Sequence, residues 1–144
     1  MFPRYLRGIG VSFVILFVRI FFGALFLMHG LDKMMNFSQL SETFPSVFGL
    51  GSYTTLMLSI FSEFACSIFL IVGMLTRIVL IPMIVSMAVA FFDIHDGFMP
   101  EGELALIYLI VFFVLFLTGP GRYSVDCLID RKVMKDKERL STHR

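Results

Sequence analysis

Residues 12–31 read SFVILFVRIFFGALFLMHGL, an apolar run that contains one formally charged residue, Arg19. A helix needs about 20 residues to cross the roughly 30 Å hydrocarbon layer of a bilayer, and this run has that length. The composition agrees, because 58% of the 144 residues are hydrophobic and 16% are charged, whereas a soluble domain carries about 25% charged residues. The run therefore predicts a membrane-spanning helix.

Three more apolar runs follow, at residues 54–75, 77–95 and 103–118. Each is long enough, or nearly so, to cross the hydrocarbon layer as a helix. The sequence therefore predicts an all-α membrane protein built as a bundle of four transmembrane helices. This transmembrane domain covers residues 1–126, and a charged cytoplasmic tail covers residues 127–144.

The positions of Lys and Arg predict the topology, because cytoplasmic segments of membrane proteins carry an excess of both. If both termini are cytoplasmic, ten of the twelve basic residues fall on that side: Arg4, Arg7, Arg77, Arg122, Arg131, Lys132, Lys135, Lys137, Arg139 and Arg144. An odd number of spans would separate the basic tail from the basic start of the chain. We therefore expect an N-in/C-in protein surrounded by the lipid bilayer. The net charge of +1 gives no sign of a nucleic-acid partner.

Two charged residues lie near the middle of the first two spans, Arg19 and Glu63. An ionisable group at that depth costs about 2.5–3.5 kcal/mol on insertion scales, so each needs a partner. The spans are antiparallel and the two groups lie at similar depth, with an offset of about 6 Å that an Arg side chain can cover. We expect a buried Arg19–Glu63 ion pair inside the bundle. Its role stays open between fixing the helix packing and forming a proton or ligand site.

Small and polar residues mark the faces that should meet inside the bundle, since they recur at helical spacing. The inward faces of the four spans are expected at Arg19, Gly23, Phe26, Gly30 and Lys33; at Ser59, Glu63, Cys66, Ser67 and Leu70; at Pro82, Ser86, Ala90 and Asp93; and at Tyr108.

A second polar cluster is predicted at the outer end of the bundle. It contains His29, Lys33, Asp93, His95 and Glu103, with Asp96 and Glu101 at the same level. Histidines beside carboxylates suit a transition metal, a haem or a proton relay to a quinone. The histidines lie on different helices with no HxxxH or HExxH spacing, so no metal site is predicted. Cys66 and Cys127 form no C-x-x-C pair, which excludes a thioredoxin-like dithiol.

Three sequence segments carry a family resemblance. Residues 19–34 contain RIFFGALF followed by HGLDKM, residues 73–77 read GMLTR after the span with Glu63, and residues 118–126 read TGPGRYSVD. In this order and at these positions, the segments resemble the DoxX family of small bacterial inner-membrane proteins. The resemblance implies a four-helix bundle in the bacterial inner (plasma) membrane, and it implies a link to quinone-dependent redox and oxidative-stress systems.

Three functions follow from these features. The first is a redox or oxidative-stress accessory subunit that binds a lipophilic molecule such as a quinone near Glu63, with a redox partner subunit handling the electrons. The alternative is a non-enzymatic membrane assembly or interaction partner, which the glycine-lined helix faces favour. The third is transport of protons or small solutes by an oligomer. Glycine-rich faces would also permit a homo-oligomer. No complete catalytic set occurs, so catalytic residues are unknown.

Overall fold

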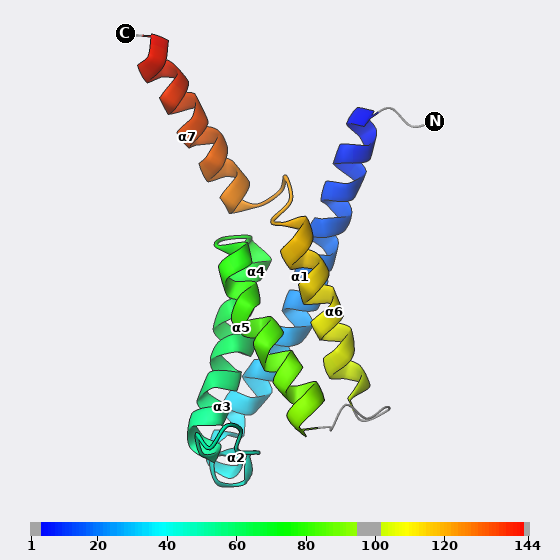
Figure 1. Cartoon of the computed structure of the whole chain (residues 1–144), viewed down its shortest axis with the longest axis vertical. Helices are drawn as coiled ribbons and strands as arrows, with labels where there is room; N and C mark the ends of the chain where they lie inside the picture. Colours follow the sequence, from blue (N-terminus) through cyan, green and yellow to red (C-terminus); the bar gives the residue numbers. More distant parts are fainter. Residues whose placement is uncertain (1–3, 95–101, 143–144) are drawn as a thin grey trace.

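The computed structural model describes residues 4–94 and 102–142, and within these ranges the chain is helical and contains no β-strand. The all-α prediction is confirmed (Figure 1). The elements, in chain order, are α1 (Arg4–Met35), α2 (Phe37–Thr43), α3 (Ser52–Ile60), the π-helical segment η1 (Phe61–Ala65), α4 (Cys66–Val72), α5 (Thr76–Val89), the π-helical segment η2 (Ala90–Ile94), α6 (Glu103–Thr118) and α7 (Val125–Thr142).

Three stretches of the described chain are long and apolar enough to cross a membrane: Gly10–Met35, Ser52–Val72 and Thr76–Ile94. They coincide with the first three predicted spans, and the second is a continuous rod of α3, η1 and α4. The helix α6 is also apolar but has 16 residues. It rises about 24 Å, which is less than the roughly 30 Å of a typical hydrocarbon layer. The chain is thus a membrane protein with three full-length candidate spans and a shorter fourth apolar helix.

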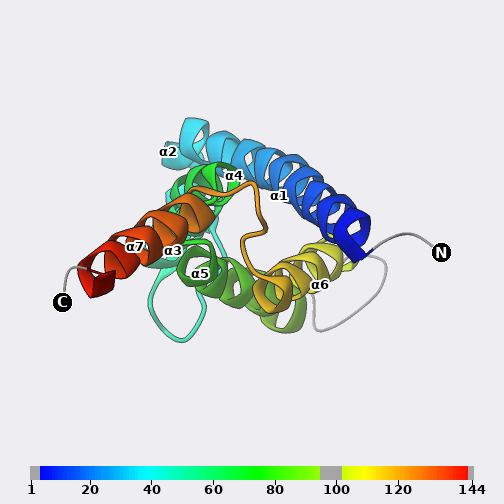
Figure 2. The same ribbon diagram turned by 90° about the horizontal axis from the view of Figure 1, so that it is seen from above.

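The helices pack around one core. α1 lies against η1 and α4, and α5 lies against α6; Figure 2 shows α1, α4, α5 and α6 surrounding a common axis. Phe26, Leu70 and Phe112 are almost fully buried, and the rings of Phe26 and Phe112 meet edge to face with centroids 4.9 Å apart. The first described residues of α1 and the far end of α7 lie toward the same end of the molecule, here called the termini end. The opposite end, which holds α2, is called the loop end.

The connection between the first two spans is structured rather than free. It contains α2 and a segment over residues 44–51 that packs back onto α3. The Val47 amide donates to the Thr55 hydroxyl oxygen at 3.4 Å, and this hydroxyl donates to the Gly51 carbonyl at 2.9 Å. Val47 is buried. The connection is therefore partly buried against the loop end of the bundle.

The second span contains one irregular turn, and α1 makes its closest approach there. In η1 the Cys66 amide donates to the Phe61 carbonyl, a π-helical bond that inserts one extra residue into the turn. Gly30 of α1 lies directly against this turn. A Cβ atom on Gly30 would be 2.6 Å from the Phe64 nitrogen and 2.8 Å from the Glu63 carbonyl carbon. Only glycine permits this backbone contact, and π-helical turns recur at functional sites.

Replacing Gly30 by alanine should therefore destabilise the bundle. We expect Gly30→Ala to cost about 1–3 kcal/mol, because the new methyl group meets rigid backbone. Gly10→Ala is the matched control on the same helix, since a Cβ atom there meets nothing within 4 Å. Thermal unfolding of both variants in detergent micelles measures the difference. Equal midpoints for the two variants would contradict the close packing of α1 on η1.

Candidate functional site

The structure separates the two charges that were expected to pair. Glu63 forms an ion pair with Lys33, whereas Arg19 donates to the backbone carbonyls of Pro120 and Tyr123 at 2.6 and 2.9 Å. The predicted Arg19–Glu63 ion pair is wrong. Glu63 lies at the level of Gly30, eleven residues along α1 from Arg19, which is about 16 Å of helix. α1 also continues to Met35, past the predicted end at residue 31, so Lys33 keeps its place on the inward stripe.

The Glu63 carboxylate lies in a small polar network. Lys33 Nζ donates to Ser59 Oγ at 2.8 Å, and the Ser59 hydroxyl donates to Glu63 Oε1 at 2.9 Å, beside the direct Lys33–Glu63 contact. The ammonium group also lies 5.5 Å from the centre of the Phe44 ring. The side chain of Glu63 is 2% exposed, whereas that of Lys33 is 25% exposed. Glu63 Oε2 is buried and has no hydrogen-bond partner among the described residues.

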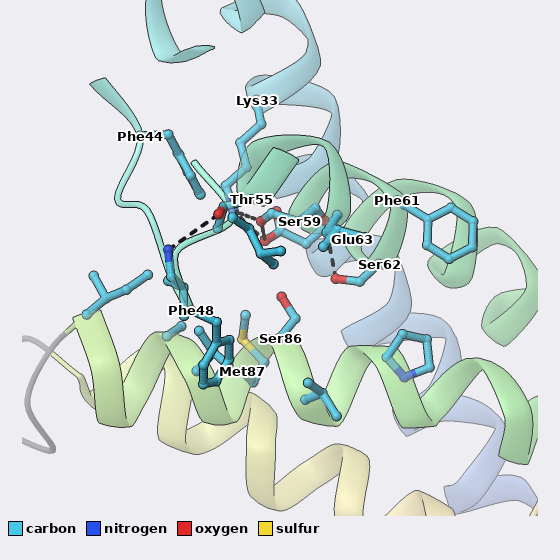
Figure 3. A pocket seen from close by; sticks show the side chains of 18 residues that line it. Lys33, Phe44, Phe48, Thr55, Ser59, Phe61, Ser62, Glu63, Ser86 and Met87 are labelled. Atoms are coloured by element: carbon cyan, nitrogen blue, oxygen red, sulfur yellow. Dashed lines mark hydrogen bonds and ion pairs between the residues drawn. The ribbon is translucent and has the colours of Figure 1, made fainter. Parts of the chain in front are cut away.

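A cavity of about 350 Å³ lies against this network and is here called the lipid-side cavity. Figure 3 shows Ser86 and Met87 on α5 facing Ser62 and Glu63 across it. Its walls come from α1, α3, η1, α5, η2 and the segment over residues 44–50. The lining residues are Lys33, Phe44, Val47, Phe48, Leu50, Thr55, Leu58, Ser59, Phe61, Ser62, Glu63, Pro82, Val85, Ser86, Met87, Val89, Ala90 and Ile94. Leu58, Phe61 and Val85 are exposed on spanning stretches. The cavity therefore opens toward the acyl chains of the bilayer.

A smaller cavity of about 200 Å³ lies on another side of the same ion pair, between α1 and α6, and is here called the α1–α6 cavity. Both cavities are lined by Lys33, Glu63, Met87 and Ala90. The smaller one adds Phe26, His29, Leu104, Ala105 and Tyr108. The Tyr108 ring packs edge to face on the His29 ring with centroids 5.9 Å apart. The Lys33–Glu63 pair thus stands between two spaces, one apolar and one that includes an imidazole and a phenol.

The structure only partly assembles the predicted outer cluster. His29 and Lys33 both line the α1–α6 cavity. Asp93 and Glu103 are exposed and line neither cavity. His95, Asp96 and Glu101 lie outside the described residues. Within residues 4–94 and 102–142, no three His, Cys, Asp or Glu side chains are grouped closely enough to hold a metal ion.

Arg19 forms a second buried polar site, at the termini end. Arg19 is 1% exposed, and its guanidinium group holds the segment over residues 119–124 across the end of the bundle, where Figure 2 shows this segment crossing. Gly73 has a φ of +78°, and a Cβ atom there would lie 2.7 Å from Arg19 Nη1 and 2.8 Å from the Ser124 Cβ. Backbone carbonyl acceptors carry no residue-type signal, so sequence reasoning missed this site, although it singled out all three segments that build it.

Asp126 completes the termini end by capping α5 from a distance of 50 residues. Its carboxylate accepts hydrogen bonds from the amides of Leu75 at 2.7 Å and Thr76 at 2.9 Å, and its own amide donates to the Gly73 carbonyl at 3.0 Å. Burial acts to raise the pKa of Asp126, but the two amide hydrogen bonds and the nearby Arg19 charge outweigh it and leave this pKa below its usual value. A carboxylate at a helix N-terminus is also favoured by the helix dipole.

Comparison with known proteins identifies the family. A family model described as DoxX matches residues 14–96. The chain belongs to the DoxX family. An uncharacterized protein of Haemophilus influenzae is 29% identical over 148 aligned residues, which cover 94% of this chain and 95% of that relative. A second uncharacterized protein of the same organism is 32% identical over 127 aligned residues, which cover 83% of this chain and 90% of that relative. No solved structure gives a significant match.

The DoxX match includes Arg19, Lys33, Glu63 and the turn over residues 73–77, so the expected membership is confirmed for the first two motif segments. The third segment, residues 118–126, lies beyond the match. In the structure it joins the others, because Arg19 from the first segment and Gly73 from the second contact it directly.

Arg19→Lys should destabilise this DoxX protein even though it keeps the charge. An ammonium group lacks the planar fork that spans two carbonyls, and we expect a loss of about 1–3 kcal/mol. Arg77→Lys is the control, because Arg77 is exposed at the same end of the bundle. Unfolding by denaturing detergent, followed by circular dichroism, compares the two variants. A loss of the same size in both would show that the carbonyl contacts of Arg19 do not matter.

Asp126 should make the stability of the fold depend on pH in the acid range. Because its folded-state pKa lies below the usual 3.8, its contribution is complete above pH 3.8 and is lost as the pH falls through the folded-state pKa. Asp126→Asn should lose about 1 kcal/mol at neutral pH and should lack this acid-dependent part. Unfolding midpoints from pH 7 downward test the difference. The control is Asp130→Asn, because Asp130 is exposed on the same helix, and this variant should show the same pH dependence as the unmodified protein. If the pH profile of Asp126→Asn runs parallel to that of the unmodified protein, Asp126 does not cap α5.

Proposed function

We propose that this protein is a DoxX protein of the bacterial inner membrane that binds a lipophilic molecule with a polar ring, chemically a quinone, in the lipid-side cavity beside Lys33 and Glu63. The observation that carries the proposal is the Glu63 carboxylate, which is buried on the cavity wall with Oε2 unpartnered among the described residues. A buried acceptor without a partner is costly, and a ligand hydroxyl would satisfy it.

The residues present fit a quinone in both of its stable forms. Lys33 carries a donor for a ring carbonyl, and Glu63 carries an acceptor for a ring hydroxyl. The volume of about 350 Å³ lies within the range of about 300–1,000 Å³ that is usual for small-molecule sites. The aromatic rings of Phe44 and Phe48 offer apolar walls for the ring, and the opening toward acyl chains admits an isoprenoid tail.

The redox role is divided between this chain and a partner. A quinone, when bound, supplies two-electron and two-proton chemistry. The residues of this chain hold the ring, exclude water from it and offer Glu63 and Lys33 as proton-carrying groups. Because the sequence has no C-x-x-C pair, the proposal assigns the electrons to a redox partner subunit.

We also propose that the chain crosses the membrane four times, with both termini in the cytoplasm. This topology is supported by the start of α1 and the far end of α7, which lie toward one end of the molecule in Figure 1, and by the basic residues of these two helices. The short helix α6 would make the fourth crossing, and slight thinning of the bilayer accommodates a span that is a few ångströms too short.

The assembly-partner and homo-oligomer alternatives require glycine faces that are free to contact another protein. A Cβ atom on Gly23 would lie 2.8 Å from the Ile71 side chain, and one on Gly30 would meet η1. Both glycines are therefore used inside the bundle, which favours the ligand-binding proposal over an interface built on this stripe.

Quinone retention during purification tests the proposed function. We expect the purified protein to carry a quinone, extracted with solvent and quantified by chromatography, near one per chain. Glu63→Gln and Lys33→Gln should each lower the retained amount about tenfold, the effect of losing one charged hydrogen bond. Glu103→Gln is the matched control, because Glu103 is exposed and lies outside both cavities.

A blocking variant separates loss of recognition from loss of folding. Ser86→Phe would fill the lipid-side cavity from the α5 wall and should abolish retention while the melting temperature stays close to that of the unmodified protein. Absence of any lipophile from the unmodified protein, or equal loss in Glu63→Gln and Glu103→Gln, would overturn the proposal.

A further inference from the structure

A third hollow lies at the termini end, far from the ion pair, where α4 ends and α7 begins. It has a volume of about 470 Å³ and is here called the α4–α7 groove. Its lining includes two arginine residues and several apolar ones, and consists of Val72, Arg122, Tyr123, Ser124, Val125, Leu128 and Arg131. None of these residues lines the two cavities beside Glu63.

The groove lies at the boundary between hydrocarbon and water. Val72 is the last residue of the second spanning stretch and is 49% exposed, so it faces acyl chains at their headgroup end. Tyr123 and Leu128 are also half or more exposed, and tyrosine rings favour this interfacial depth. Arg122 and Arg131 are exposed, and neither forms a salt bridge with a carboxylate of the described chain. The guanidinium group of Arg122 lies against Gly8 of α1, about 3.4 Å from where a Cβ atom of that glycine would be, and its exposed side chain can turn toward the groove. Two exposed arginines therefore stand at the rim of apolar walls that continue into the lipid.

The floor of the groove is fixed by bonds that do not involve its ligand-facing groups. The Ser124 hydroxyl, which is buried, donates to the Gly121 carbonyl at 2.9 Å, and its oxygen accepts from the Cys127 amide at 3.1 Å. Arg19 holds the carbonyls on either side of Arg122, and Asp126 ties the first turn of α7 to the turn before α5. Because this framework is already ordered, binding costs little conformational entropy.

We propose that the α4–α7 groove binds the phosphate headgroup of an anionic glycerophospholipid from the adjacent leaflet. Arg131 would engage the phosphate oxygens, and Arg122 would join it by turning its side chain from Gly8 toward the groove, since guanidinium groups bind phosphate through paired hydrogen bonds. Val72 and Leu128 would lie along the upper acyl chain. The apolar walls favour a lipid over a free phosphate ion, and basic pockets at this level of membrane proteins suit anionic headgroups. This inference is independent of the proposed quinone site.

Native mass spectrometry of the purified full-length protein tests the groove. The protein is titrated with phosphatidylglycerol, with phosphatidylcholine and with inorganic phosphate, and the apparent dissociation constants are compared. We expect phosphatidylglycerol to bind most tightly. The double variant Arg122→Gln/Arg131→Gln should weaken its binding roughly tenfold or more, given the usual contribution of each basic group near an anionic headgroup.

The matched control is Lys135→Gln/Lys137→Gln, which removes the same charge from α7 outside the groove and should change binding less than about threefold. Equal weakening in both double variants would mean general attraction to a basic helix and would overturn the site. Phosphatidylcholine binding as tightly as phosphatidylglycerol, or inorganic phosphate displacing the lipid at equal concentration, would overturn the choice of ligand.

If the glutamine variant does not fold, the double variant Arg122→Lys/Arg131→Lys tests the same contacts. It keeps the charge but not the paired hydrogen bonds, so an unchanged dissociation constant would refute phosphate binding by the two arginines.

Discussion

The cost of leaving a charged group unpaired in hydrocarbon determines how this bundle is assembled. Arg19 and Glu63 are both about 1% exposed, so neither can take its partner from water. Each takes it from a distant part of the chain. Arg19 uses the carbonyls of residues 120 and 123, a hundred positions later, and Glu63 uses Lys33 from the preceding span. Meeting these two requirements brings α1, η1 and the segment after α6 into one arrangement.

The contacts of Arg19 and those of Glu63 differ in how rigidly they are held. The Arg19 guanidinium is enclosed by Gly73 and Ser124, and its acceptors belong to a backbone that Asp126 fixes to the start of α5. Lys33, in contrast, has a flexible side chain that is 25% exposed and stands between two cavities. The contacts of Arg19 at the termini end are therefore fixed in place, whereas the pair that Glu63 forms depends on a partly exposed lysine side chain. Pairing Arg19 with Glu63 would have removed this difference.

Much of the fold could be predicted from the sequence because a membrane imposes strong rules on composition. The apolar runs place the spans, and the inward stripe of α1 from Arg19 to Lys33 is buried or half-buried as expected. The pairing could not be predicted in the same way. The depths of Arg19 and Glu63 are counted from the ends of the predicted spans, and the first predicted span ends at residue 31, before Lys33. Backbone carbonyl acceptors, in addition, cannot be recognised from residue type. Lys33 was visible on the correct stripe, but a lysine near a helix end is normally assigned to the interface.

The irregular turn η1 lies where the bundle holds a polar network inside an apolar protein. An extra residue in a helical turn rotates the residues after it by about 100° relative to those before it. Ser59 and Ser62, before or within the turn, and Cys66 and Ser67, after it, all lie on or near the buried side. Gly30 allows α1 to close against this widened turn, and Lys33, one helical turn further along α1, then reaches Glu63. The contact of Gly30 with this turn thus brings Lys33 to Glu63 and places a paired charge on the wall of a cavity that opens toward lipid.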